Sequence, residues 1–212
     1  MGKTKGTARS PDTAVRERLV SAATDLFSRK GYAATTTREI VTAAGVTKPV
    51  LYYYFRNKEG IYLELMQKAT TEFEEILNAS RNDSGSPKRR VLRLCDQVLA
   101  LFMRRIEAAK LMYSIYYGPP QGAPFIDFDA LHLQFQNTLI NLVKKGITAE
   151  ELRRGNVANR VWAILGATHI AMELELCHPK RRLGREGLGR VLKFILDGIS
   201  VNRTRQKGEE PC

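Results

Sequence analysis

Apolar residues recur at helical spacing along most of the chain. Near the N-terminal end, Val15, Leu19, Ala22 and Leu26 fall on one face of a helix. No segment shows the sustained alternation of apolar and polar residues that a half-buried strand requires. The pattern therefore predicts an all-α protein of about nine helices, with three short helices at the N-terminal end followed by a helical bundle.

Capping and breaking residues set the limits of the predicted helices. Thr36 and Glu39 form a capping box, and Gly45 ends the short helix that they begin. Thr148 and Glu151 repeat the capping-box pattern and predict a second, one-turn helix. The strongest break is the stretch from Gly118 to Pro124. The predicted helices cover roughly 15–30, 36–44, 47–56, 57–80, 87–117, 125–145, 148–155, 156–177 and 183–203.

Composition places the chain among ordinary globular proteins. It has 212 residues, of which 43% are apolar and 26% charged, so it can bury a sizeable core. It lacks the long apolar run of a membrane span and the apolar core of a secretory signal, so we expect a cytoplasmic protein with no membrane partner. Cys95, Cys177 and Cys212 fit neither a disulfide framework nor a metal site, as expected in a reducing compartment.

Positive charge is concentrated at the N-terminal end. The formal net charge is +12, and residues 1–60 carry eleven Lys or Arg against five Asp or Glu. This excess, which includes Lys3, Lys5 and Arg9, is compatible with a plain solvated surface, with a nucleic-acid site or with an anionic-lipid site. Charge alone does not distinguish these three possibilities.

The spacing of the first three helices is more specific than their charge. Two short helices joined by Ala44-Gly45-Val46-Thr47 match a helix-turn-helix, whose second helix enters the DNA major groove. Residues 20–32, 36–46 and 47–59 resemble the N-terminal domain of TetR-type transcriptional regulators. The resemblance implies a homodimeric, ligand-responsive regulator, usually a repressor, that binds a palindromic DNA operator. The predicted domains are a basic flexible tail (1–12), the DNA-binding domain (13–60), an effector-binding and dimerisation domain (61–204) and a polar tail (205–212).

Eight residues are predicted to contact DNA. Thr36 and Thr37 lie at a helix N-terminus, where free amides and hydroxyls bind phosphate. Arg38 suits bidentate contact to guanine O6 and N7. Lys48, Val50 and Tyr53 are the exposed candidates on the recognition helix, and the resemblance assigns phosphate contacts to Tyr52 and Lys58. We expect Tyr54 to be a packing residue, and Gly60 costs its helix roughly 1 kcal/mol relative to Ala.

Aromatic residues cluster in the middle of the chain, where the resemblance implies an effector site. Seven aromatic side chains fall between residues 102 and 135, and they serve equally well as plain core. If they line a pocket, the ligand is a small apolar or aromatic molecule. The predicted lining is Phe102, Tyr113, Tyr117, Phe128, Phe135, Trp162 and His169.

The last two long helices carry more apolar surface than one face can bury. A helix that is apolar nearly all round must be covered on both sides, either by its own chain or by a second subunit. The resemblance implies a four-helix dimer interface here. The predicted interface residues are Val157, Val161, Ile164, Leu188, Leu192, Ile195 and Ile199.

Enzymatic chemistry has no support in the sequence. His169 and Glu173 share a helix face, but no third ligand stands at a recognisable spacing, so we expect no metal and no cofactor. Neither a nucleophile elbow nor a catalytic cysteine context is present. The alternatives to a repressor are an activator of the same fold and, less favoured, a basic membrane-surface or scaffold protein.

Overall fold

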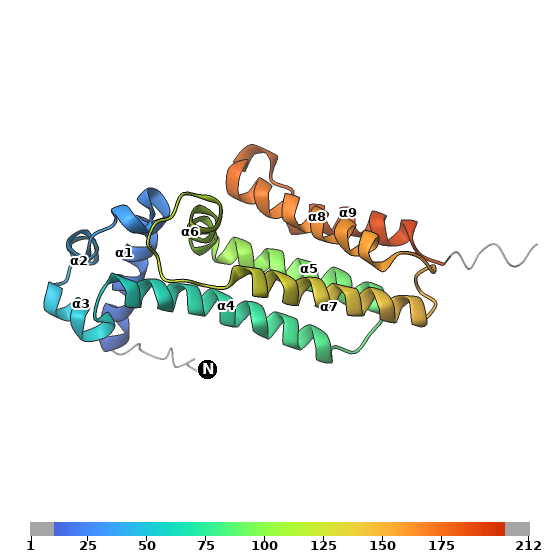
Figure 1. Ribbon diagram of the computed structural model, residues 1–212, viewed down its shortest axis with the longest axis horizontal. Coiled ribbons are helices and arrows are strands. Elements are labelled where there is room, and N and C mark those ends of the chain that lie inside the picture. Colours follow the sequence, from blue (N-terminus) through green and yellow to red (C-terminus); the bar gives the residue numbers. More distant parts are fainter. Residues whose placement is uncertain (1–10, 202–212) are drawn as a thin grey trace, which may run out of the picture. The chain divides into compact units, whose positions relative to one another are not determined.

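The computed structural model describes residues 11–201 and confirms an all-α chain over that range (Figure 1). Lys3, Lys5, Arg9, the polar tail and Cys212 lie outside the described residues. Within them, Cys95 is buried and Cys177 is exposed, and both are free thiols. The elements are α1 (Pro11–Ala34), α2 (Thr37–Ala44), α3 (Lys48–Phe55), α4 (Lys58–Asn82), α5 (Pro87–Arg104), α6 (Ile106–Tyr117), α7 (Phe128–Thr148), α8 (Val157–Cys177), a 3-10 turn η1 (Pro179–Arg181) and α9 (Gly184–Gly198).

The chain divides into two compact units that do not follow the predicted boundary at residue 60. Among the described residues, the first unit holds 11–70 together with 105–126, and the second holds 71–104 together with 127–201. In the first unit, α1 packs against α2 and α6, and α2 packs against α3. Residues 105–126 therefore join the N-terminal unit because α6 lies against α1, which is a non-local contact.

The second unit is a helical bundle with one apolar core. Helix α5 contacts α7, α8 and α9, and α8 contacts both α7 and α9 (Figure 1). Leu94, Leu99, Leu139, Val143 and Ile164 are completely buried where these helices meet. No helix within residues 11–201 combines the length and the apolar character needed to cross a membrane.

The predicted helix over 87–117 is in fact two helices. Helix α5 ends at Arg104 and α6 begins at Ile106, with Arg105 between them in a non-helical conformation (φ −110°, ψ 32°). No Gly or Pro marks this break in the sequence. It falls where the chain passes from the second unit to the first, so tertiary packing overrides the local helix preference.

The prediction of a one-turn helix at 148–155 is wrong. Helix α7 continues to Thr148, and Leu152 instead forms an isolated antiparallel bridge with Ser200. The Arg153 backbone nitrogen donates to the Ile199 carbonyl oxygen over 2.9 Å. This pairing also ends α9 at Gly198, five residues before the predicted end, because the following backbone is bonded to the 151–153 segment.

Candidate functional site

The helix-turn-helix is held by apolar residues spaced along three helices of the first unit. Ile40 on α2 and Leu51 on α3 are completely buried, and Phe55 is nearly so. Leu19 and Phe27 on α1 complete this small core. The core fixes the relative orientation of α2 and α3, so that the polar faces of both helices remain on the outside.

The turn between α2 and α3 depends on Gly45. This residue has φ 63° and ψ 41°, the left-handed conformation that residues with a Cβ rarely adopt. The Gly45 nitrogen donates to the Thr42 carbonyl, and the Val46 nitrogen donates to the Val41 carbonyl over 3.0 Å. The last carbonyls of α2 are thus satisfied while the chain turns into α3.

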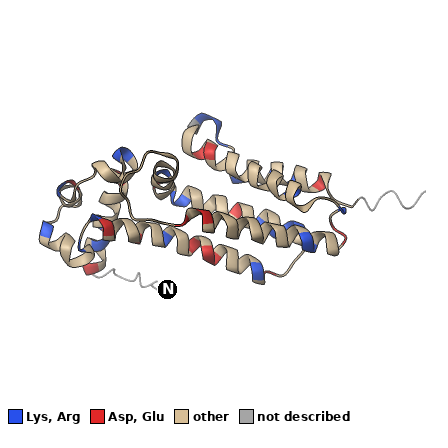
Figure 2. Cartoon of the chain, in the orientation of Figure 1, with Lys and Arg blue, Asp and Glu red and all other residues tan. Residues whose placement is uncertain are grey.

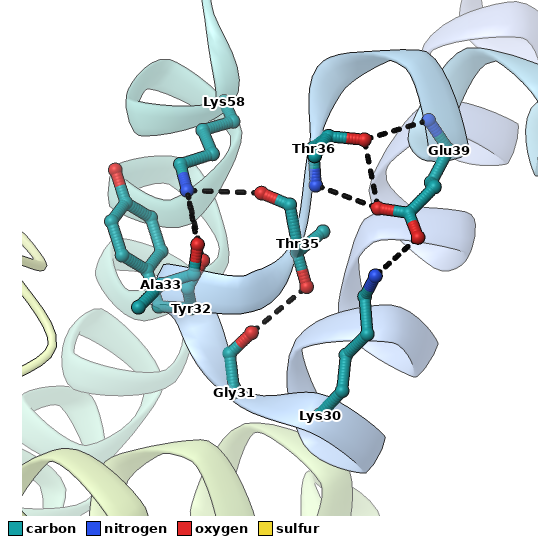
Figure 3. Close-up of polar contacts among 8 residues, drawn as sticks. All are labelled: Lys30, Gly31, Tyr32, Ala33, Thr35, Thr36, Glu39 and Lys58. Atoms are coloured by element: carbon teal, nitrogen blue, oxygen red, sulfur yellow. Dashed lines mark hydrogen bonds and ion pairs between the residues drawn. The ribbon is translucent and has the colours of Figure 1, made fainter.

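The predicted capping box opens α2. The Thr36 backbone nitrogen donates to Glu39 Oε2 over 2.9 Å, and the Glu39 nitrogen donates to Thr36 Oγ1 (Figure 3). Lys30 at the end of α1 forms an ion pair with the same carboxylate. Hydrogen bonds from Lys30 and then Thr36 lower the pKa of Glu39 to about 2. The box therefore fixes the start of α2 and ties it to α1.

Lys58, a predicted phosphate contact, directs its ammonium group to backbone carbonyls of its own chain. Its Nζ donates to the carbonyl oxygens of Tyr32 and Thr35, each over 2.9 Å, and weakly to that of Ala33 (Figure 3). The ammonium also lies 4.3 Å from the centre of the Tyr32 ring. Burial, and then the charge of Lys30, lower the pKa of Lys58. Lys58 therefore joins the start of α4 to the end of α1, and its donors are engaged inside the protein.

Most of the residues predicted to contact DNA from α2 and α3 have exposed side chains. The side chains of Arg38 and Lys48 form no hydrogen bond or ion pair with any other residue between 11 and 201, and both are exposed. Figure 2 shows basic positions on both α2 and α3. Tyr53 is 79% exposed, and Tyr52 is about half exposed. Val50 is partly buried at its place on α3. The cations and phenol groups remain available to an outside partner.

Three threonines stand at the starts of α2 and α3, in different situations. Thr36 is committed to Glu39 through its backbone nitrogen and its hydroxyl, which donates to Glu39 Oε2 over 2.8 Å. Thr37 occupies the first position of α2, where a backbone N–H has no intrahelical acceptor. Thr47 is the N-cap of α3, but its side chain makes no capping hydrogen bond. Thr37 and the unpredicted Thr47 are thus better placed than Thr36 to bind phosphate.

The structure assigns roles to Tyr54 on α3 and to Gly60 at the start of α4. The Tyr54 hydroxyl donates to the Asp12 carboxylate, which holds α3 to α1 and raises the pKa of Tyr54 to about 12. A Cβ at Gly60 would lie 2.2 Å from the Phe55 carbonyl oxygen. Any larger residue in the first turn of α4 would have to displace this backbone, which explains why a residue of low helix propensity stands there.

The predicted effector-site residues are divided between the two units and differ in exposure. Tyr113 and Tyr117 belong to the first unit, and Tyr117 is 74% exposed. In the second unit Phe102 and Phe135 are buried in the core, Phe128 is partly buried and Trp162 is 58% exposed. Trp162 therefore cannot line an enclosed pocket of the single chain.

His169 lies beside a second histidine rather than beside a metal-binding set. Its ring centre is 5.2 Å from that of His132, and burial followed by His132 lowers the pKa of His169. No group of three or more His, Cys, Asp or Glu side chains suited to a metal ion occurs within residues 11–201. Glu173 is exposed on the same helix as His169.

Most of the predicted dimer-interface residues are core residues of the single chain. Val161, Ile164, Leu188 and Leu192 are buried, and the remaining three are partly buried. Their burial assigns them to the packing of α8 and α9 against α5 within the single chain, and their place in a dimer interface stays a prediction. The residues partly buried are Val157, Ile195 and Ile199.

The exposed faces of α8 and α9 carry a different set of apolar residues. Trp162 and Ile170 are exposed on α8, while Val191 and Phe194 are exposed on α9, with Phe194 at 81%. The sequence could have indicated the exposure of Phe194, because this residue lies outside the apolar stripe of α9 and next to the charged Lys193. We refer to Trp162, Ile170, Val191 and Phe194 as the α8–α9 face.

Comparison with known proteins bears on the first unit above all. The sequence model described as "Bacterial regulatory proteins, tetR family" matches residues 19–65, which span most of α1, all of α2 and α3, and the start of α4. The chain is 36% identical over 61 residues to the HTH-type transcriptional regulator QacR of Staphylococcus aureus, covering 29% of this chain and 32% of QacR. It is 32% identical over 72 residues to IcaR of Staphylococcus epidermidis, a negative regulator of the biofilm operon icaADBC, covering 34% and 39% of the two chains. The chain thus matches little more than a third of the length of these relatives.

The likeness of fold extends over both units. The crystal structure of PfmR, a TetR-family transcriptional regulator of Thermus thermophilus, aligns with 88% of this chain and 98% of its own, with a TM-score of 0.68 and 22% identity. At that identity the likeness establishes the fold. Residues 19–65 therefore match the helix-turn-helix domain of TetR-type regulators in sequence, and the described chain has the fold seen in structures of that family.

Proposed function

We propose that the protein is a transcriptional regulator, acting as a repressor, that binds a palindromic DNA operator as a homodimer. The observation that carries this proposal is the pair of unpartnered cations, Arg38 and Lys48, on the outer surface of a rigidly capped helix-turn-helix. An unpaired Arg fork on a helix matches the acceptors of guanine in the major groove. The IcaR relative, a negative regulator, supports repression over activation.

The contacts divide into base reading and phosphate binding. Arg38, Val50 and Tyr53 are assigned to base edges, with Val50 against a thymine methyl group. Thr37, Lys48 and Tyr52 are assigned to phosphates, and Thr47 is added to that group because its hydroxyl is unbonded within the described residues. Lys58 and Thr36 are assigned to holding the domain together.

The test is selection of randomised duplexes by the purified protein, followed by sequencing of the bound fraction. The proposal predicts an enriched inverted repeat, with half-sites about one helical turn apart because two symmetry-related helices read adjacent major grooves. Recovery of no enriched sequence, or of a single unrepeated site, would contradict a dimeric operator-binding protein. An otherwise folded Arg38→Ala variant is the control and should lose preference at one base pair of each half.

The homodimer is proposed to form through the α8–α9 face. Contiguous exposed apolar side chains on neighbouring helices are typical of a protein–protein interface, and α8 and α9 are in contact with one another. Trp162 and Ile170 are eight residues apart, which places them on the same side of α8. This assignment replaces the buried residues of the two helices with residues that a second copy can reach.

We also propose a small apolar or aromatic effector that releases the protein from its operator. Its site is assigned to the second unit among Phe102, Phe135 and His169, where an apolar wall and a neutral imidazole come from one bundle. A compound library screened by thermal shift identifies ligands, and Phe135→Ala should weaken a true effector while leaving operator affinity nearly unchanged. Unchanged ligand affinity in the folded variant would move the site elsewhere.

A further inference from the structure

The second unit contains a hollow of about 260 Å³ that is lined by cations. It lies between the end of α4, the beginning of α5 and the last turns of α7, and Figure 2 shows basic residues at the ends of α4 and α7. Among the described residues, no acidic side chain takes part in this lining. Its polar and charged members include Ser80, Arg81, Arg90, Thr138, Lys144 and Lys145.

Arg90 is the most deeply placed of these cations. Only 8% of it is exposed, and its Nη2 donates to the Ser80 carbonyl over 2.8 Å and to the Arg81 carbonyl over 3.3 Å. These bonds cap the end of α4 and give Arg90 a structural role. Its Nε, however, has no hydrogen-bond partner, and none of the ion pairs within residues 11–201 includes this guanidinium. The Arg90 charge is thus buried without a counter-ion.

Ser80 supplies a second unsatisfied group in the same hollow. The residue is 5% exposed, and its Oγ makes no hydrogen bond to any residue that the structure describes. Buried polar atoms without partners are rare, because each costs the free energy of its lost hydration. Water molecules supply hydrogen bonds to such atoms but leave the buried positive charge uncompensated. An anion with oxygen acceptors satisfies the hydrogen bonds and the charge together.

We propose that this hollow is a binding site for a small oxyanion, the phosphate or carboxylate group of a metabolite. Arg90 Nε–H and the Ser80 hydroxyl donate to the anion from the interior, while Arg81, Lys144 and Lys145 surround it with positive charge. Thr138 contributes shape, because its hydroxyl already donates to the Gln134 carbonyl over 2.8 Å. The proposal stands apart from DNA binding, since none of these residues belongs to the helix-turn-helix unit.

The test reads the Arg90 Nε–Hε signal directly by NMR in the full-length, 15N-labelled protein. Inorganic phosphate replaces chloride at constant ionic strength, so that general screening stays fixed. The Arg90 Nε–Hε resonance is assigned by its disappearance from the spectrum of Arg90→Lys. If that variant does not fold, the resonance is assigned by its change of chemical shift in Ser80→Ala. A saturable shift of this signal is expected with phosphate. A parallel titration with succinate decides whether phosphate or carboxylate is the preferred group.

Matched charge variants separate this site from the general basicity of the chain. Lys144→Gln/Lys145→Gln should raise the phosphate dissociation constant by about tenfold, because two charges near the anion are lost. Lys180→Gln/Lys193→Gln removes the same charge from exposed positions outside the hollow and should change it by less than about twofold. An Arg90 signal that moves with neither anion, or that responds equally in the two double variants, would overturn the proposal.

Discussion

The side-chain oxygen of Gln121 lies 2.8 Å from the backbone nitrogen of Tyr32 and accepts its hydrogen bond. Gln121 is in turn fixed by its own amide nitrogen, which donates to Ser114 Oγ over 2.8 Å. A Cβ at Gly31 would lie 2.6 Å from the same Gln121 oxygen, and Gly31 has φ 83°. Gln121, in the segment that follows α6, therefore binds the end of α1. The carbonyl oxygen of the same Tyr32 accepts a hydrogen bond from Lys58.

This contact predicts a local change in amide protection. Gln121→Ala should speed hydrogen exchange at the Tyr32 amide, because that N–H loses its acceptor, while most of α4 should keep its protection. The measurement is residue-resolved exchange by NMR. Gln67→Ala, which removes a comparable amide from an exposed position on α4, is the control. Unaltered exchange at Tyr32 would mean that the Gln121 contact is dispensable.

Replacement of Lys58 distinguishes a structural lysine from a phosphate-binding one. Lys58→Met should lower the thermal stability of the protein, since up to three carbonyl oxygens lose their donor. It should leave the salt dependence of non-specific DNA binding nearly unchanged. Lys48→Met should do the reverse and reduce the slope of log K against log salt by about 1. A reduced slope in folded Lys58→Met would restore its phosphate role.

The capping box predicts a dependence of stability on acid. The folded-state pKa of Glu39 is about 2, below its ordinary value of 4.5, so its contribution is present above about pH 4.5 and is lost as the pH falls towards 2. The difference in denaturation midpoint between the wild type and Glu39→Gln should therefore narrow over that interval. In Lys30→Gln the pKa of Glu39 should rise, because its main hydrogen-bond donor is gone, so the loss should be smaller and should be complete at a higher pH. A difference that is constant with pH would contradict this assignment.

The α8–α9 face predicts two kinds of mutational effect on neighbouring positions of one helix. Phe194→Glu should give a folded monomer, because the side chain is exposed in the single chain. Leu192→Glu should instead unfold the protein, because it buries a charge in the core. Trp162 is the single tryptophan, so its emission should shift to the red when the wild type is diluted and be red-shifted at all concentrations in Phe194→Glu. Sedimentation of the wild type as a monomer at high concentration would contradict the interface.

Local signals in the sequence were sufficient where structure depends on neighbouring residues. The Thr36–Glu39 box and the end of α2 at Gly45 were predicted from residues only a few positions apart, and each lies where expected. The exposure of Arg38 and Tyr53 follows from the same short helices. Such features depend on backbone geometry within one or two turns, which the sequence specifies directly.

The errors arose where distant segments meet. The break at Arg105 depends on packing in two different units, and the pairing of Leu152 with Ser200 joins positions 48 residues apart. The phosphate role of Lys58 stays a prediction, but local spacing could not show that its hydrogen-bond partners lie at the end of α1. The apolar stripes of α8 and α9 correctly predicted which side chains are buried. Periodicity does not show whether such side chains pack against helices of the same chain or of a second subunit.

The central claim is that the helix-turn-helix reads DNA sequence through Arg38. The most direct measurement is the ratio of affinities for the selected inverted repeat and for a scrambled duplex, by fluorescence anisotropy at one salt concentration. For the wild type we predict a ratio of about a thousand or more. For Arg38→Ala the specific affinity should fall by about 1–3 kcal/mol per half-site, with a much smaller loss on the scrambled duplex. Equal affinity of the wild type for both duplexes, or an equal loss on both in Arg38→Ala, would contradict the account.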